Sequence, residues 1–170
     1  LDNAMAHQVT VPGGNPTLAA DILWSTEADF DSLFVQVSTD DGKTWKSLGN
    51  ADTVSTLSPG ADAKLVSNLP GFNGESHVFK HEVFDLTPYA GKTVKLQVRY
   101  WTDGAAVGRG FEFDDLSITA GATTVFSDNA ESGDNGWTLD GFRRTTGSDT
   151  TEHPHYYLAE NRQYVGYDDG

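Results

Sequence analysis

Apolar and polar residues alternate with a period of two in several short segments of the chain, which is typical of half-buried β-strands. The clearest case is 93–102, where Val94, Leu96 and Val98 share one face and Lys95 lies on the other. Enrichment in β-forming residues or weaker alternation marks the remaining candidates. Further strands are expected over 7–11, 18–24, 33–38, 44–48, 77–86, 107–118, 123–126 and 155–165.

Turn-forming residues separate these segments. Asp40-Asp41-Gly42 predicts a hairpin between 33–38 and 44–48. The phrase from Ser38 to Trp45 resembles the Asp-box turn of sialidases, which is structural rather than catalytic. No segment shows the pattern of a long amphipathic helix, which a parallel α/β sheet would need between its strands. The sequence therefore predicts an all-β fold, a jelly-roll-like antiparallel β-sandwich.

Three carboxylates interrupt the strand expected over 107–118. Glu112, Asp114 and Asp115 stand between large apolar residues there, although aspartate is uncommon in strands because its short side chain competes for backbone groups. Two interpretations are open. A hard cation, with calcium the favoured ion, could bind where the sheet edge meets a loop, or the strand could end in solvent with Asp115 making a turn.

Two more acidic segments, 25–31 and 127–136, strengthen the metal hypothesis. Calcium takes about six to eight oxygen ligands, mostly from irregular loops, so these segments could build one or two structural Ca²⁺ sites if the fold brings them together. The alternative is that a strongly acidic protein simply carries acidic loops throughout. The candidate metal ligands are Asp114, Asp115, Glu131, Asp128, Glu27 and Asp31.

Composition narrows the function classes. The 170 residues suffice for a domain with its own core. The formal net charge of −14 argues against a nucleic-acid partner, whose phosphates require lysine and arginine. There is no cysteine, so thiolate metal sites are excluded. No apolar run approaches the roughly 20 residues of a membrane span, and the abrupt start at Leu1 without a signal peptide is typical of an excised fragment.

No residue qualifies as catalytic by its pattern. His77 and His81 are spaced like zinc ligands, but the motif His-Glu-x-x-His is absent because no second histidine follows Glu82. A Ser-His-Asp set is not recognisable either. We therefore expect a module without enzymatic activity of its own.

Several phrases, in order, resemble the C-terminal region of immune-inhibitor-A-type secreted zinc metallopeptidases. The first three are shared with many jelly-roll modules, including MAM-like and carbohydrate-binding ones, and the last is more specific. They lie at 33–45, at 84–92, at 98–104 with 110–116, and at 135–142 with 156–162 and 166–168. The resemblance implies a calcium-binding β-sandwich attached after the catalytic domain of a secreted, extracellular enzyme. The family's zinc motif has no counterpart here.

The resemblance also bears on domain organisation. Jelly rolls of this kind usually open with an acidic strand, but here the phrase from Phe126 to Trp137 stands near the end. We expect a main β-sandwich over 1–121 and a C-terminal segment, 122–170, that folds back to complete it. The alternative is that 122–170 begins a truncated neighbouring module.

The expected role is that of a calcium-stabilised accessory module that positions or presents a parent catalytic domain, with a protein or glycan substrate as a possible further partner. The alternative is a carbohydrate-binding module of a secreted enzyme. That role would require exposed aromatic side chains, although burial is their commoner fate. The candidates are Trp24, Trp101, Trp137, Tyr156 and Tyr157.

Overall fold

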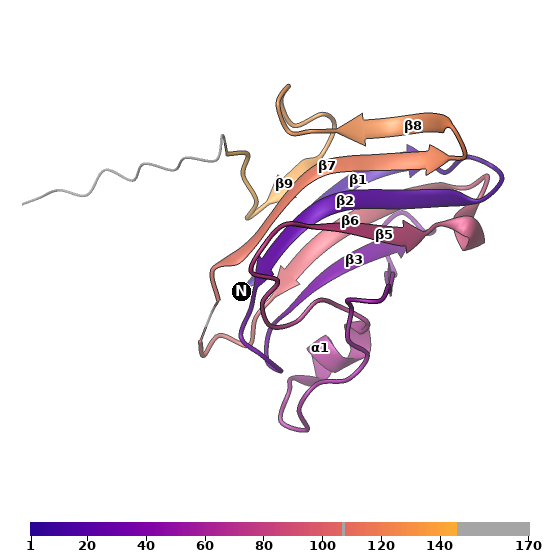
Figure 1. Ribbon diagram of the computed structural model, residues 1–170. Coiled ribbons are helices and arrows are strands. Elements are labelled where there is room, and N and C mark those ends of the chain that lie inside the picture. Colours follow the sequence, from indigo (N-terminus) through magenta and orange to yellow (C-terminus); the bar gives the residue numbers. More distant parts are fainter. Residues whose placement is uncertain (107, 146–170) are drawn as a thin grey trace, which may run out of the picture.

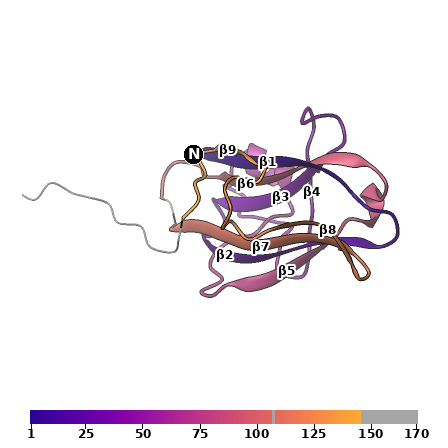
Figure 2. The same cartoon turned by 90° about the horizontal axis from the view of Figure 1, so that it is seen from above.

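Two antiparallel sheets pack face to face in the computed structural model, which describes residues 1–106 and 108–145 (Figures 1 and 2). This confirms the predicted all-β, jelly-roll-like sandwich. The strands are β1 (Asp2–Thr10), β2 (Pro16–Ser25), β3 (Ser32–Ser38), β4 (Lys46–Ser47), β5 (Lys80–Asp85), β6 (Thr93–Trp101), β7 (Gly110–Ala120), β8 (Thr123–Asp128) and β9 (Thr138–Asp140). Two short helical elements join them, α1 (Ala63–Asn68) and the 3₁₀-helix η1 (Thr87–Tyr89).

The order of strands in each sheet differs from their order in the chain. One sheet runs β4-β3-β6-β1-β9 and the other runs β5-β2-β7-β8. β6 lies between β1 and β3, and β2 lies between β5 and β7, so strands distant in sequence form the centre of each sheet. This arrangement brings the ends of β2, β3 and β6 to one end of the sandwich.

The core lies between the two sheets. Alternate residues of β2, such as Leu18 and Ile22, point inward and are at most 1% exposed, and Leu96 and Val98 of β6 meet them from the other sheet. Complete burial of such a side chain contributes about 1.5–3 kcal/mol. The alternation read from the sequence over 18–24 and 93–102 is therefore the alternation between core and outer face.

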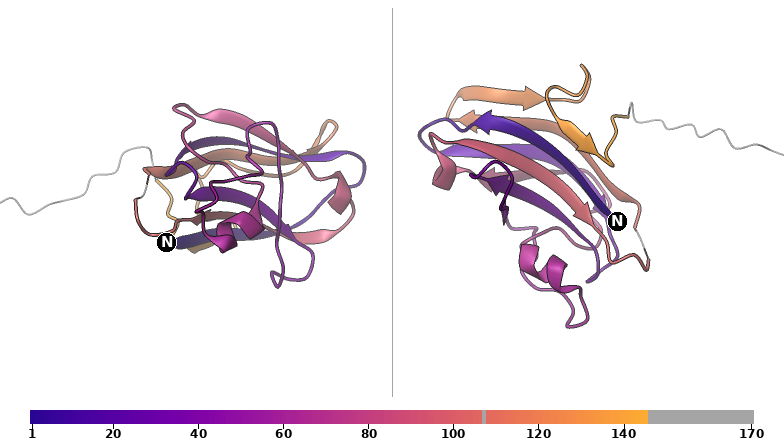
Figure 3. Two further views of the ribbon diagram at one scale, coloured as in Figure 1. Left: turned by 90° about the horizontal axis from the view of Figure 1, so that it is seen from below. Right: turned by 180° about the vertical axis from the view of Figure 1, so that it is seen from behind.

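A long connection covers the outer face of β3, all of whose residues are buried. Residues 49–72, which include α1, lie against this face (Figure 3). The Gln36 amide donates to Asn68 Oδ1 at 3.0 Å. Gly71 lies so close to the Phe34 ring that a Cβ there would come within 2.7 Å of it. α1 is the one helix in this connection.

The strand boundaries depart from the sequence prediction mainly at the two ends of the described chain. β1 begins at Asp2 rather than near His7, because pairing with β6 along its whole length orders a segment without apolar alternation. β9 was not predicted as a strand, and it forms by pairing with β1. The strand expected over 155–165 lies outside the described residues.

Residues after 121 pair with both sheets. β8 adds to β7, and the chain then crosses to the other sheet, where β9 adds to β1. The remainder of the expected C-terminal segment, 146–170, lies outside the described residues. Within the described part of the chain, no helix is both long and apolar enough to span a membrane.

Candidate metal centre

Three carboxylates from three segments converge where β2, β3 and β6 meet. Glu27 lies in the loop after β2, Asp31 directly precedes β3, and Asp103 follows the end of β6. One carboxylate oxygen from each lies within 4.8 Å of the others. Among the described residues, no other set of three acidic or histidine ligands approaches this closely.

Asp31 is the centre of this group and is completely buried. Its Oδ1 accepts a hydrogen bond from the backbone N–H of Asp103 at 3.2 Å, and its Oδ2 accepts one from the Tyr100 hydroxyl at 3.4 Å. Burial raises the pKa of Asp31, and the charge of Asp103 adds to the effect. The pKa of the Tyr100 hydroxyl rises to about 12, through burial first and then the negative charge of Asp31.

Glu27 contributes an oxygen that is shielded from solvent. Its Oε2 is buried and has no hydrogen-bond partner among the described residues. No described lysine, arginine or histidine forms an ion pair with any of the three carboxylates. Asp31 is buried, Glu27 is partly buried and Asp103 is exposed. Burying a carboxylate without compensating positive charge is costly, so the chemistry of this donor set suits a hard divalent cation.

Asn73 fixes the shape of the acidic loop. Its side-chain nitrogen donates to the backbone carbonyl of Asp31 at 2.7 Å and to that of Glu27 at 3.4 Å. Its side-chain oxygen accepts from the backbone N–H of Asp29 at 3.0 Å. Asp29 has a φ of 69°, an uncommon conformation for a non-glycine residue. These bonds fix the backbone of the loop that carries Glu27 and Asp31.

The structure brings together two of the six ligands proposed from sequence, Glu27 and Asp31. Asp114, Asp128 and Glu131 instead line a separate groove beside β7. Asp115 is exposed and adopts a φ of 48° at an irregularity in β7, where its N–H bonds the Asp114 carboxylate. The strand does not end at Asp115, because β7 continues to Ala120, so Asp115 marks an irregularity within the strand.

Asp128 has a structural role. Its Oδ1 accepts from the N–H of Ala130 at 2.9 Å, and its Oδ2 accepts from the Trp137 indole N–H at 2.8 Å. The first bond ends β8 in a turn. The second holds the Trp137 ring beside His7 and Phe126.

Sequence reasoning missed Asp103. The run Thr102-Asp103-Gly104 indicated only the turn that ends a strand, and Asp103 does accept a hydrogen bond from Ala105 N–H in that turn. One signal could have found it. Asp103 follows a well-defined strand, β6, and Asp31 directly precedes the neighbouring strand in the sheet, β3. Using that signal requires knowing that β3 and β6 are antiparallel neighbours.

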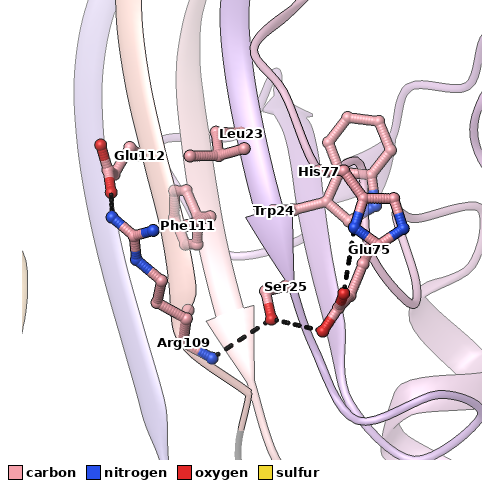
Figure 4. A pocket seen from close by; sticks show the side chains of 9 residues that line it. Leu23, Trp24, Ser25, Glu75, His77, Arg109, Phe111 and Glu112 are labelled. Atoms are coloured by element: carbon pink, nitrogen blue, oxygen red, sulfur yellow. Dashed lines mark hydrogen bonds and ion pairs between the residues drawn. The ribbon is translucent and has the colours of Figure 1, made fainter.

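A second polar site lies in a cleft of about 280 Å³ lined by the end of β2, the start of β7, Glu75 and His77. Glu75 accepts a hydrogen bond from Ser25 Oγ at 3.1 Å and pairs with His77 Nδ1 at 3.2 Å (Figure 4). The carboxylate therefore stands between serine and histidine. A base that activates a serine must itself contact the hydroxyl, so this order does not make Ser25 a nucleophile.

The aromatic residues proposed from the sequence for glycan binding differ in their exposure. Trp24 and Trp137 belong to the core, at 4% and 7% exposed. Trp101 is partly exposed, and Tyr156 and Tyr157 lie outside the described residues. Neither Trp24 nor Trp137 offers a face on which a sugar ring could stack.

The sequence of the chain is similar to parts of known bacterial proteins, one of them named as a metalloprotease. The family model described as "Immune inhibitor A-like, MAM domain" matches residues 1–147. Pre-pro-metalloprotease PrtV, from two strains of Vibrio cholerae serotype O1, is 32% identical over 172 aligned positions that cover 100% of this chain. Immune inhibitor A of Bacillus thuringiensis subsp. alesti is 33% identical over 146 positions, or 86% of this chain.

The match covers only a small part of each relative. The chain spans 17% of the length of PrtV and 19% of that of the Bacillus protein. Both the family model and the relatives agree with the resemblance noted from the sequence. The chain belongs to the family of immune inhibitor A-like MAM domains.

Proposed function

We propose that this MAM-type sandwich is a non-catalytic accessory module of a secreted, extracellular metalloprotease, and that it is stabilised by one structural calcium ion. The observation that carries the proposal is the buried Asp31 carboxylate, which lies beside Glu27 and Asp103 without a compensating cation among the described residues. Glu27, Asp31 and Asp103 would hold the ion, and the hard oxygen donors select Ca²⁺ over softer metals.

The position of the three carboxylates explains why an ion there would matter to the fold. Glu27 follows β2 of one sheet, whereas Asp31 and Asp103 adjoin β3 and β6 of the other. An ion bound by all three would join the two sheets at the end where β2 and β6 end and β3 begins (Figure 1). The function is therefore mechanical: a rigid sandwich that presents or positions a parent catalytic domain.

Thermal unfolding with calcium and with chelator tests the proposal. An ion that binds only the folded chain, at a concentration 100 times its Kd, adds about 2.7 kcal/mol, which corresponds to a rise of about 5–10 °C in Tm for a chain of this size. Magnesium at the same concentration serves as the control, because it demands a stricter octahedral geometry. An unchanged Tm on chelation would overturn the structural ion.

The non-catalytic part has its own test. The purified chain is expected to leave casein intact, and release of peptides that survives removal of contaminating proteases would contradict it. Adding the chain to a catalytic domain from the same parent protein, or deleting it from that protein, tests whether it positions the enzyme. Deletion is expected to alter cleavage of protein substrates more than cleavage of short peptides.

A further inference from the structure

Within the part of the chain that the structure describes, one edge of β7 is not covered by a strand over the half that carries the acidic residues. On one side, Gly110–Asp114 pairs with β2. On the other side, pairing with β8 begins only at Leu116, because β8 ends in the Asp128 turn and the chain crosses to the other sheet. Among the described residues, no strand and no backbone–backbone hydrogen bond covers this side between Gly110 and Asp115.

A groove of about 360 Å³ runs along this edge. Phe111 and Phe113 point toward the core side, where they pack against it, and Glu112 and Asp114 alternate with them on the outer side. Phe142 also lines the groove and packs against Phe111, with ring centroids 5.0 Å apart. The edge therefore presents an apolar row and an acidic row.

The charge of the groove is predominantly negative. Five carboxylates and two arginines line it: Glu112, Asp114, Asp128, Glu131 and Asp134 against Arg143 and Arg144. Arg109 pairs with Glu112 at 2.7 Å, but both side chains are exposed, so solvent screens the pair. A second copy of this chain would set Glu112 and Asp114 near their own counterparts, and like charges across a strand pair are unfavourable.

We propose that this edge of β7 accepts an extended peptide segment with alternating basic and apolar residues, which adds as a strand beside Gly110–Asp115. In β-strand addition, the backbone supplies hydrogen bonds and alternate side chains supply specificity. Apolar residues of the segment lie on the side of Phe111 and Phe113, and basic residues lie on the side of Glu112 and Asp114. This surface is separate from the proposed calcium centre, so the two proposals stand or fall independently.

The experiment measures binding of a labelled peptide of about ten residues by fluorescence anisotropy. One peptide alternates lysine and valine, and the other has the same composition with all lysines in one block. The alternating peptide is expected to bind at least about tenfold more tightly, because only its lysines and valines separate to opposite faces of a strand. Equal binding of both peptides would mean attraction by charge alone and would overturn strand addition.

A double variant localises the site. Glu112→Gln with Asp114→Asn, which keeps the acceptor for Asp115 N–H, is expected to weaken binding about tenfold. The matched control is Asp41→Asn with Asp62→Asn, which removes the same charge from exposed turns and retains a side-chain cap on α1.

Three other results would each overturn the proposed peptide site. Absence of binding by either peptide would overturn the proposal, and the acidic residues and the irregularity at Asp115 would then serve only to guard the edge against aggregation. Formation of a dimer that the alternating peptide fails to dissociate would show that a second copy covers the edge, and would overturn the proposed occupant. Undiminished binding by the double variant would place the peptide elsewhere and would overturn the proposal.

Discussion

The side-chain amide of Asn73 donates a 2.7 Å hydrogen bond to the backbone carbonyl of Asp31, across 42 residues of sequence. The segment around Asn73 also pairs with the end of β2, through the backbone of Ser76 and Trp24. The acidic loop is therefore held by hydrogen bonds at both of its ends to the one segment around Asn73. Its shape depends on a residue that offers no ligand atom to the centre.

Replacement of Asn73 by alanine removes three hydrogen bonds and leaves the carbonyl of Asp31 and the N–H of Asp29 without this partner. A partly buried group that loses its partner costs about 1–3 kcal/mol, so we expect the free energy of unfolding in chelator to fall by that amount. Urea denaturation measures it. Asn129→Ala, in an exposed loop where the side chain accepts one weak bond from Glu131 N–H, should change it by less than about 0.5 kcal/mol.

Replacement of Asp31 by asparagine tests how much the buried charge destabilises the fold without calcium and how much it contributes to calcium binding. Burial raises the pKa of Asp31 above its ordinary value of 3.8. Without calcium, the stability that protonated Asp31 contributes is present below pH 3.8, and it is lost as pH rises through the higher folded-state pKa. Asparagine does not titrate, so the variant in chelator should be more stable than the wild type at neutral pH.

With calcium the ranking should reverse. The variant lacks one charged ligand, so the rise in Tm on adding calcium is expected to shrink from about 5–10 °C to nearly nothing. Melting curves of both proteins in chelator and in calcium, at neutral pH and near pH 4, give all four comparisons. A full calcium response in Asp31→Asn would exclude this centre as the binding site.

Asp40 stabilises the turn between β3 and β4 through its ionised form. It accepts hydrogen bonds from the Thr44 hydroxyl, the Thr44 N–H and Ser38 Oγ, which together lower its pKa to about 2. This contribution is present above the ordinary value of 3.8 and is lost as pH falls through about 2. Asp40→Asn should therefore lower Tm at pH 7 and converge with the wild type at about pH 2; an equal difference at both pH values would contradict the assignment.

Trp137 ties β9 and the preceding loop to the sandwich. It is 7% exposed, packs against Phe126 and His7, and donates to Asp128. Trp137→Ala should cost about 3–5 kcal/mol through loss of packing. Trp137→Phe keeps most of the packing but loses the hydrogen bond, so its cost should be smaller. Urea denaturation compares the two; similar costs would show that the bond to Asp128, rather than packing, dominates.

Single residues show which parts of the fold could be predicted from the sequence. The alternation of Val94, Leu96 and Val98 predicted β6 and its inward face, because the period of a strand is a local property. Glu82 in β5 does not follow the rule that inward positions are apolar. It lies at a position that faces the core, is 3% exposed and accepts a hydrogen bond from Asn50. A charged residue at an inward position can be explained only by a partner 32 residues away.

The candidate metal centre, too, could be predicted from the sequence only in part. Local sequence marked the loop after β2 as acidic and placed Glu27 and Asp31 among the possible ligands. It also gave equal weight to Asp114, Asp115, Asp128 and Glu131, because composition alone does not distinguish a turn-forming carboxylate from a ligand. Only the antiparallel pairing of β3 with β6 places Asp103 beside Asp31.

The sequence by itself determined the fold class, the main strands and the family, since these follow from periodicity, turn residues and phrases that are contiguous in the chain. The tertiary structure decided which acidic residues meet, which aromatic rings are buried and, among the described residues, which strand edge has no neighbouring strand. These depend on the order of strands in the sheets, and that order arises from packing between segments far apart in the chain rather than from the preferences of any one segment.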